Sequence, residues 1–321
     1  MKRAKLSHKN KISDGLEKFA NIYIVGYKYP NHDHSGIYSI NYDNYDTFIW
    51  TKEILEPLEV KTWKEIIINE MKKGKNIYNM ARLYRINDYK ELVDFAEIYD
   101  VEFFDCSNPK LFEEFKQYAE IGLKGINSKV ITIMGTGRQS GKFTTSMILK
   151  SKLEKYFELG TVGTEPQSKL CGNDEMVIPQ LIPTCHVAST IFGAIKKVDL
   201  KDKDLIIVSG QTGIFSNPLE VGTGRGGGVI SLSILLGSKP DYIILASNTV
   251  NIDDIKRNIN IIELLTGKRV IGITINGKNF KRDNILLDKI SHKLNIPVAD
   301  VVKGINLDEF IEYIVENIKN K

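Results

Sequence analysis

A glycine-rich run that ends in one lysine, residues 135–142, has the residue types of a phosphate-binding loop. An apolar run at 130–134 precedes it, and a helical pattern follows. The run contains three glycines, Gly135, Gly137 and Gly141. Glycines permit the tight turns that point successive backbone N–H groups at one anion, and the positive end of the next helix faces the same point. The sequence therefore predicts a polyphosphate site in which Lys142 reaches the terminal oxygens.

The spacing is a variant of the common pattern. Five residues separate Gly135 from Gly141, where the standard loop has four, and Phe143 stands where Ser or Thr usually contacts magnesium. The hydroxyls of Thr144 and Thr145 come next, so either can serve as the Mg²⁺ ligand. The other loop residues expected to surround a nucleotide are Thr136, Arg138, Gln139 and Ser140.

Carboxylates follow in two polar, glycine-containing segments, 160–167 and 171–175. In phosphate-loop folds such segments reach the far side of the terminal phosphate. Glu165, Asp174 and Glu175 are therefore candidates to hold Mg²⁺ or to act as a general base. We expect Asp174 as the metal ligand and the two glutamates as catalytic groups; the alternative is a solvated loop without a role in catalysis.

Four further residues are candidates to contact ligands. Gln211 and Thr212 follow a buried strand pattern at 205–208, at the edge where open α/β sheets bind ligands, and are assigned to substrate. Arg225 is the one cation of the glycine-rich run 221–229 and can clamp a phosphate or carboxylate, unless that run is only a flexible loop. Asn276 ends another strand, and its amide can both donate to and accept from an adenine edge.

The elements that must position these groups alternate between strand and helix patterns. Apolar β-branched runs that are expected to be buried parallel strands lie at 22–26, 76–78, 101–106, 130–134, 205–208, 242–246 and 270–275. Helical patterns lie at 62–73, 87–99, 146–157, 183–197, 229–236, 252–265 and 307–319. The expected fold is α/β: a small Rossmann-like domain at 1–126, then a P-loop NTPase domain with a mostly parallel sheet at 127–321.

The composition limits the classes of function that are expected for this protein. The 321 residues are 42% hydrophobic and 26% charged, with a net charge of +4 spread over many lysines. This is the composition of an ordinary globular protein, with little support for nucleic-acid binding. No apolar run is long enough for a membrane span, no secretion signal is present, and the three cysteines show no metal-ligand spacing. We expect a cytoplasmic homo-oligomer that acts on a small molecule.

Taken together, these segments resemble the DgcN-like family, long described as a domain of unknown function and partly linked to D-glutamate N-acetylation. The loop from Gly135 to Thr145 is similar to that family's Gly-Thr-Asp-Cys-x-Val-Gly-Lys-x-Thr-Thr, including the five-residue gap. The segments 209–214 and 236–241 resemble its Glu-Gly-Gln-Gly-Ser-Leu and Gly-Ser-x-Pro-Asp motifs. The resemblance implies a transferase of amino-acid metabolism that uses an acyl group carried by coenzyme A.

The loop and Asn276 are more distantly similar to dethiobiotin synthetase. That similarity implies ATP binding, an adenine contact by Asn276 and phosphorylation of a carboxylate or carbamate. The chain also departs from the DgcN-like pattern: Ser209 replaces a strand-end Glu, and Ala81-Arg82 and Asp105-Cys106-Ser107 replace Gly-Leu-His and Asp-Val-Arg motifs. The change at Ser209 argues against the family's metal geometry in this chain, and the changed N-terminal motifs argue against its D-glutamate substrate.

The function expected from the residues is an ATP- and Mg²⁺-dependent enzyme, ligase-like or kinase-like. It activates a small amino-acid-like carboxylic acid by phosphoryl transfer and can then form an amide. The resemblance provides a second hypothesis, amino-acid N-acyltransfer with coenzyme A. A nucleotide-dependent switch or metallochaperone is a third, non-enzymatic hypothesis.

Overall fold

The computed structural model describes residues 2–29, 44–82, 89–108, 110–215, 227–276 and 281–320. The chain divides into two compact units. Unit 1 comprises Met1–Leu111 and Pro166–Gly172, and unit 2 comprises Phe112–Glu165 and Asn173–Lys321. Most of helix α4, Lys110–Gly122, belongs to unit 2. The domain boundary expected from the sequence, between residues 126 and 127, stays a prediction.

Unit 1 contains a five-stranded parallel sheet with the order β2-β1-β3-β4-β5. Its strands are β1 Lys2–His8, β2 Ile22–Tyr29, β3 Thr47–Trp50, β4 Asn76–Asn79 and β5 Phe103–Asp105. All five strands run in one direction, so their carboxyl ends meet at one edge. The order reverses between β1 and β3, which is the arrangement of doubly wound nucleotide-binding folds.

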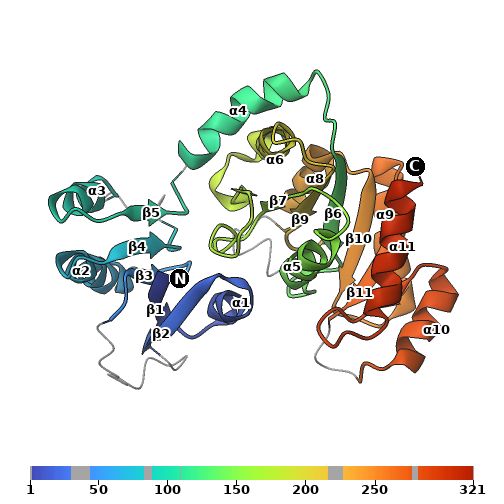
Figure 1. Ribbon diagram of the computed structural model, residues 1–321, viewed down its shortest axis with the longest axis horizontal. Coiled ribbons are helices and arrows are strands. Elements are labelled where there is room, and N and C mark those ends of the chain that lie inside the picture. The colour runs from blue at the N-terminus through green and yellow to red at the C-terminus, as the bar shows by residue number, and fades with distance from the viewer. Residues whose placement is uncertain are drawn as a thin grey trace. The chain divides into compact units, whose positions relative to one another are not determined.

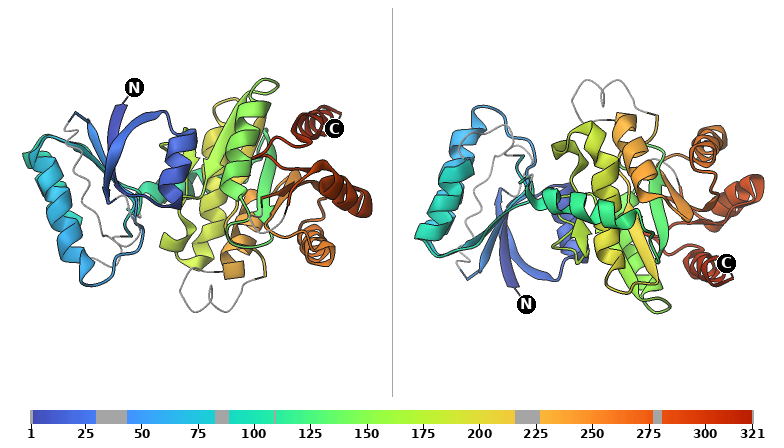
Figure 2. Two further views of the ribbon diagram at one scale, coloured as in Figure 1. Left: turned by 90° about the horizontal axis from the view of Figure 1, so that it is seen from below. Right: turned by 90° about the horizontal axis from the view of Figure 1, so that it is seen from above.

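Helices cover both faces of this sheet. They are α1 Lys11–Phe19, α2 Glu59–Lys72 and α3 Tyr89–Ile98. Figure 1 and Figure 2 show α2 and α3 on one face and α1 on the other. Trp63 of α2 is buried against Phe48 and Ile77 of the sheet, and Asn10 caps α1 by accepting hydrogen bonds from the N–H groups of Ile12 and Ser13.

Unit 2 contains a seven-stranded parallel sheet with the order β12-β11-β10-β6-β9-β7-β8. Its strands are β6 Lys129–Gly135, β7 Leu159–Gly163, β8 Glu175–Met176, β9 Leu205–Ser209, β10 Tyr242–Ser247, β11 Val270–Ile275 and β12 Val298–Ala299. The strand that leads into the phosphate loop, β6, is therefore central, between β10 and β9.

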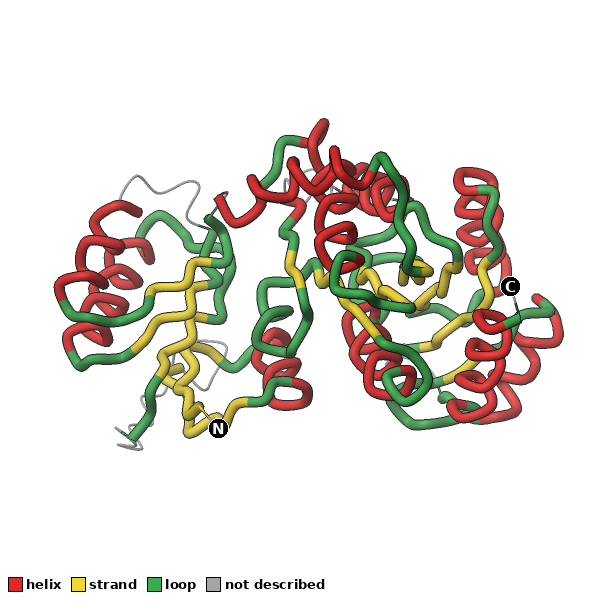
Figure 3. The backbone as a smooth tube through the Cα atoms, turned by 45° about the horizontal axis from the view of Figure 1, so that its top comes forward, coloured by secondary structure: helices red, strands yellow, loops and turns green. Residues whose placement is uncertain are grey.

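Alternation along β6 separates two apolar cores. Ile131 and Ile133 pack with residues of α5 and α11 on one face of the sheet, whereas Met134 packs with residues of α8, α9 and α10 on the other. The helices of unit 2 are α4, α5 Lys142–Leu153, α6 Thr184–Asp199, α8 Gly227–Ser238, α9 Ile252–Thr266, α10 Asn284–Leu294 and α11 Leu307–Lys319. Figure 3 shows the strands of each sheet bordered by helices.

The fold class expected from the sequence is confirmed, and the sheet of unit 2 is parallel between all its paired strands. Several elements were missed because they are polar or rich in glycine. Strand β1 carries Lys2, Arg3 and Lys5, and β7 lies in the polar, glycine-containing segment that starts at residue 160; the sequence pattern predicts neither strand. Helix α5 begins at Lys142 and not at residue 146. Among the described helices, none combines the length and the apolar character that crossing a membrane requires.

A buried ion pair joins α6 to the start of β6. Lys196 Nζ lies 2.7 Å from Asp199 Oδ2, and the backbone N–H groups of Asn127 and Ser128 donate to Asp199 Oδ1 over 2.9 and 2.7 Å. Burial raises the pKa of Asp199, but the hydrogen bonds from Lys196 and Ser128 outweigh it and hold this pKa below its ordinary value.

Unit 2 is therefore expected to lose stability in acid through Asp199. A carboxylate with a depressed pKa stabilises the folded state above its unfolded pKa, about 3.9, and the stabilisation is lost as the pH falls through the folded pKa. The free energy of unfolding, measured by urea denaturation from pH 7 down to pH 2, tests this expectation. The Asp199→Asn variant is expected to show a shallower dependence on pH below about pH 4; the same slope in both proteins would contradict it.

Candidate active site

The loop between β6 and α5 is shaped by two left-handed residues. Gly141 has a φ of 90° and Gln139 a φ of 59°. Gly141 also has no room for a side chain, because a Cβ there would lie 2.5 Å from the Asn276 amide nitrogen. Strand β6 is buried up to Gly135, and the loop then turns into the first residue of α5. The positive end of this helix consequently faces the loop, as phosphate binding requires.

Lys142 folds back across the loop that precedes it. Its Nζ donates to the Gly137 carbonyl over 2.8 Å and to Ser140 Oγ over 3.1 Å, and the side chain is only 6% exposed. Gly135 leaves room for the folded-back lysine, since a Cβ there would lie 2.7 Å from Lys142 Nζ. The ammonium group is thus held inside the turn where the sequence places the terminal phosphate.

The two candidate magnesium ligands of α5 differ in environment. Thr145 is fully buried, and its Oγ1 lies 2.9 Å from Thr274 Oγ1 of β11. Thr144 is half-buried and so retains access to solvent. Thr145 therefore ties α5 to β11, and Thr144 is the more exposed of the two; which of them holds Mg²⁺ stays a prediction.

Asn276 clamps the phosphate loop from the end of β11. Its Nδ2 donates to the Ser140 carbonyl over 3.1 Å, and its Oδ1 is buried without a hydrogen-bond partner. A buried amide oxygen without a donor costs free energy. This oxygen is an acceptor without a donor, and the adenine contact of Asn276 stays a prediction.

The segment after β9 lies directly beside the phosphate loop. Gly213 forms an isolated bridge with Thr136, and Gly210 approaches β6 so closely that a Cβ would lie 2.4 Å from the Ile133 carbonyl oxygen. Thr212 has a φ of 48°, which is strained for a β-branched residue, and its hydroxyl donates to the Gly227 carbonyl over 2.8 Å.

Gln211 belongs to the same turn and is buried. Its side-chain amide donates to the Thr164 carbonyl and its Oε1 accepts from the Gln180 amide. Thr164 Oγ1 in turn donates to the Ser209 carbonyl over 2.9 Å. The predicted substrate residues Gln211 and Thr212 are thus brought next to the phosphate loop, and Ser209, which replaces the expected acid, has a buried Oγ without a hydrogen-bond partner.

The three candidate carboxylates are distributed over different parts of unit 2. Asp174 Oδ2 accepts hydrogen bonds from the N–H and Oγ1 of Thr161 in β7, over 2.9 and 3.0 Å. Glu175 Oε1 lies 3.3 Å from Lys197 Nζ of α6. Glu165 is half-buried and directly follows Thr164, which hydrogen-bonds to the turn at Gln211. Of the three, Glu165 is the one placed by its neighbour at the phosphate-loop edge, and the roles of all three stay predictions.

Arg225, the predicted clamp, lies outside the described residues. Sequence reasoning also missed a polar contact at the carboxyl end of β10. Thr136 Oγ1 donates to Asn248 Oδ1 over 3.2 Å, and Asn248 Nδ2 donates to the Arg138 carbonyl over 3.0 Å. The signal was present, because Ser247 and Asn248 directly follow a buried apolar strand.

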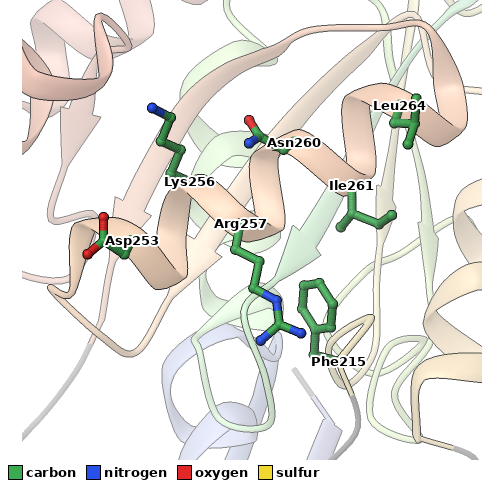
Figure 4. A pocket seen from close by; sticks show the side chains of 7 residues that line it. All are labelled: Phe215, Asp253, Lys256, Arg257, Asn260, Ile261 and Leu264. Atoms are coloured by element: carbon green, nitrogen blue, oxygen red, sulfur yellow. The ribbon is translucent and has the colours of Figure 1, made fainter.

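A pocket of about 400 Å³ lies on the outer side of α9 (Figure 4). It is lined by Phe215, Asp253, Lys256, Arg257, Asn260, Ile261 and Leu264. The Arg257 guanidinium carbon lies 4.0 Å from the centroid of the Phe215 ring, so the cation is stacked on the ring. No predicted site residue lines this pocket, and the candidate site is the phosphate loop with the strand ends around it.

Comparisons with known proteins identify the family and similar folds. A family model described as a domain of unknown function, the DUF1611 C-terminal P-loop domain, matches residues 118–310. A crystal structure of a DUF1611 family protein from Anabaena variabilis ATCC 29413 is similar over all of both chains, with a TM-score of 0.71 and 15% identity. No curated protein matches the chain.

Two further structures are less similar. A nucleotide-binding protein from Archaeoglobus fulgidus in complex with ADP has a TM-score of 0.42 and 13% identity, covering 64% of this chain and 93% of that one. Cobyrinic acid a,c-diamide synthase from Mycobacterium smegmatis with bound ADP and magnesium has a TM-score of 0.40 and 13% identity, covering 60% and 96%.

Proposed function

The chain belongs to the DUF1611 family of P-loop proteins, and from that premise we propose that it binds ATP and uses it to activate a small amino-acid-like carboxylic acid. The observation that carries the proposal is the arrangement of Lys142. Its buried ammonium group lies over Gly135 and is held by the Gly137 carbonyl and Ser140 Oγ. A cation fixed at a helix N-terminus stabilises the charge of a transferring phosphoryl group.

The proposed reaction has two steps. A carboxylate oxygen of the acid attacks the γ-phosphorus of ATP, the bond from that phosphorus to the β–γ bridging oxygen breaks, and ADP leaves with the electron pair. An amine then attacks the acyl carbon of the acyl phosphate, inorganic phosphate leaves, and the amine nitrogen loses a proton to give an amide. Both steps need positioning and charge stabilisation more than covalent participation by the protein.

The chain's own residues have distinct tasks in this proposal. Lys142 and the loop N–H groups bind the β- and γ-phosphates, and Mg²⁺, when bound, neutralises phosphate charge. The half-buried hydroxyl of Thr144 fits the ion, because hard cations prefer oxygen ligands. Gln211 and Thr212 shape the turn beside the loop where the acid is proposed to bind, and Arg225 is proposed as the clamp on its carboxylate.

Calorimetry and product analysis test the proposal. The protein is titrated with ATP, with GTP and with coenzyme A, each with Mg²⁺, and ADP release is then measured across a panel of small carboxylic and amino acids. Heat with ATP and acid-dependent ADP release support phosphoryl transfer. Binding of coenzyme A with acylation of an amine while ATP stays intact would instead support the N-acyltransferase suggested by the DgcN-like resemblance, and absence of heat with every ligand would reject both.

Asn276 offers a narrower prediction about the base. Because its buried Oδ1 lacks a donor, we expect Asn276→Ala to weaken ATP binding about tenfold more than it weakens binding of inorganic triphosphate. The comparison with triphosphate separates the base contact from the clamp on Ser140, which both ligands share. Equal losses for the two ligands would contradict an adenine contact.

A further inference from the structure

The carboxyl edge of the unit 1 sheet contains buried polar side chains that the proposed function does not use. They are Ser7, His8, Thr51, Asn79, Asp105 and Ser107. Burying a polar group is unfavourable unless it finds a partner, and in open parallel sheets this edge is where ligands bind. The partners of each group therefore indicate whether the edge is only structural.

The part of the edge at β1 and β3 is internally satisfied. Ser7 Oγ accepts from the Thr51 N–H over 2.8 Å, and Thr51 Oγ1 donates to the His8 carbonyl over 2.9 Å. His8 Nδ1 lies 2.8 Å from Ser7 Oγ. These contacts join two strand ends, and the buried side-chain polar atoms of these three described residues all have partners.

The part of the edge at β4 and β5 contains a buried polar atom without a hydrogen-bond partner. Asp105 Oδ1 accepts three hydrogen bonds, from Asn79 Nδ2 over 3.0 Å, from the Ser107 N–H over 3.0 Å and from Ser107 Oγ over 2.8 Å. Asp105 Oδ2 is buried and has no hydrogen-bond partner, although the whole residue is only 4% exposed. Because all three donors are on one oxygen, the second oxygen faces away from them as an unused acceptor.

Asp105 shares this part of the edge with a described ion pair. Arg82, just after β4, pairs with Glu53 over 3.1 Å. Asn79 Nδ2, which donates to Asp105 Oδ1, also donates over 3.0 Å to the carbonyl of Ala81, the residue before Arg82. Two carboxylates and one guanidinium leave one negative charge in excess.

Burial raises the pKa of Asp105 to about 6, and the hydrogen bonds from Ser107 and Asn79 offset only part of that effect. At neutral pH the carboxylate is consequently charged but incompletely compensated. A positively charged donor would remove this deficit, since charge-assisted hydrogen bonds are roughly twice as strong as neutral ones.

We propose that Asp105 Oδ2, beside the Arg82–Glu53 pair, is a binding site in unit 1 for a small molecule that carries a protonated primary amine. The ammonium group donates to Asp105 Oδ2 and neutralises the excess charge. A divalent cation is a poorer occupant because it requires several oxygen ligands, whereas Asn79 and Ser107 present donors to Asp105. The site is built within unit 1 and does not rest on the proposed nucleotide chemistry.

Carboxyl-selective NMR of the full chain tests the site, with ethylamine as the probe and ethanol as the neutral control. Saturable ethylamine binding is expected to lower the pKa of Asp105 below about 6, and ethanol is expected to leave it unchanged. Asp105→Asn is expected to reduce ethylamine affinity at least about tenfold. Asp14→Asn, the same change at an exposed carboxylate of unit 1, is expected to leave it unchanged.

A second variant separates binding from a structural role. Arg82→Gln removes the positive charge beside Asp105 and is expected to tighten ethylamine binding several-fold, whereas loss of packing would weaken it. An Asp105 pKa that does not move with ethylamine, equal affinity in Asp105→Asn, or weaker binding in Arg82→Gln would each overturn the proposal. A site that fails this test leaves the nucleotide titrations unaffected, so the two proposals can fail separately.

Discussion

Replacing Lys142 with alanine is expected to reduce ATP affinity at least about 100-fold, roughly 2.7 kcal/mol. The reason is local: Nζ is the cation that crosses the loop, between the Gly137 carbonyl and Ser140 Oγ, and it is almost fully buried. A fixed ammonium group that meets a phosphate in a site shielded from water contributes far more than an exposed one. Calorimetry with ATP and Mg²⁺, compared with the unmodified protein, measures the loss.

A matched control is available in the same helix. Lys152 lies in the last turn of α5 and pairs with Asp308 over 3.1 Å at the surface. Lys152→Ala removes one positive charge from α5, as Lys142→Ala does, but it is expected to leave ATP affinity within about twofold because exposed charges are screened. Retained affinity in Lys142→Ala would remove the basis of the proposed function.

The sequence was sufficient to predict the phosphate loop because its requirements are local. Glycines at Gly135 and Gly141 are needed for close approach and for a left-handed turn, and both needs can be inferred from residue type and spacing. The choice between Thr144 and Thr145 was not predictable. It depends on Thr274 of β11, more than 100 residues away, whose hydroxyl lies 2.9 Å from that of Thr145.

The partners of the candidate carboxylates were likewise not predictable from the sequence. Nothing in the spacing of Asp174 indicates that it accepts hydrogen bonds from Thr161, or that Glu175 lies beside Lys197 of α6. These partners follow from the pairing of β7 with β8, and β7 was not expected because Gly160 and Thr161 interrupt its apolar pattern. Strand β1 was missed for a related reason: it alternates lysines with the buried residues Ala4 and Leu6, and its charges hid its β pattern.

Helix α4 provides a test of packing in unit 2, because it crosses α6 at very short range. Gly193 of α6 faces α4 so closely that a Cβ there would lie 1.8 Å from the Phe115 carbonyl oxygen. Gly122 of α4 faces α6 in turn, where a Cβ would lie 2.8 Å from the Phe192 ring. Gly193 thus allows the backbone of α4 to approach α6, and Gly122 leaves room for the Phe192 ring. Figure 1 shows where α4 and α6 lie in unit 2.

Gly193→Ala is therefore expected to lower the free energy of unfolding by about 3 kcal/mol, even though alanine alone favours a helix by about 1 kcal/mol. A Cβ that meets a backbone carbonyl can be accommodated only if the helices separate. Gly122→Ala serves as the graded control, because its Cβ would meet a side-chain ring that can move, and we expect a smaller loss. Urea denaturation measures both. Equal losses, or no loss in Gly193→Ala, would mean that α4 and α6 do not pack as closely as described, and α4 would then contribute little to the stability of unit 2.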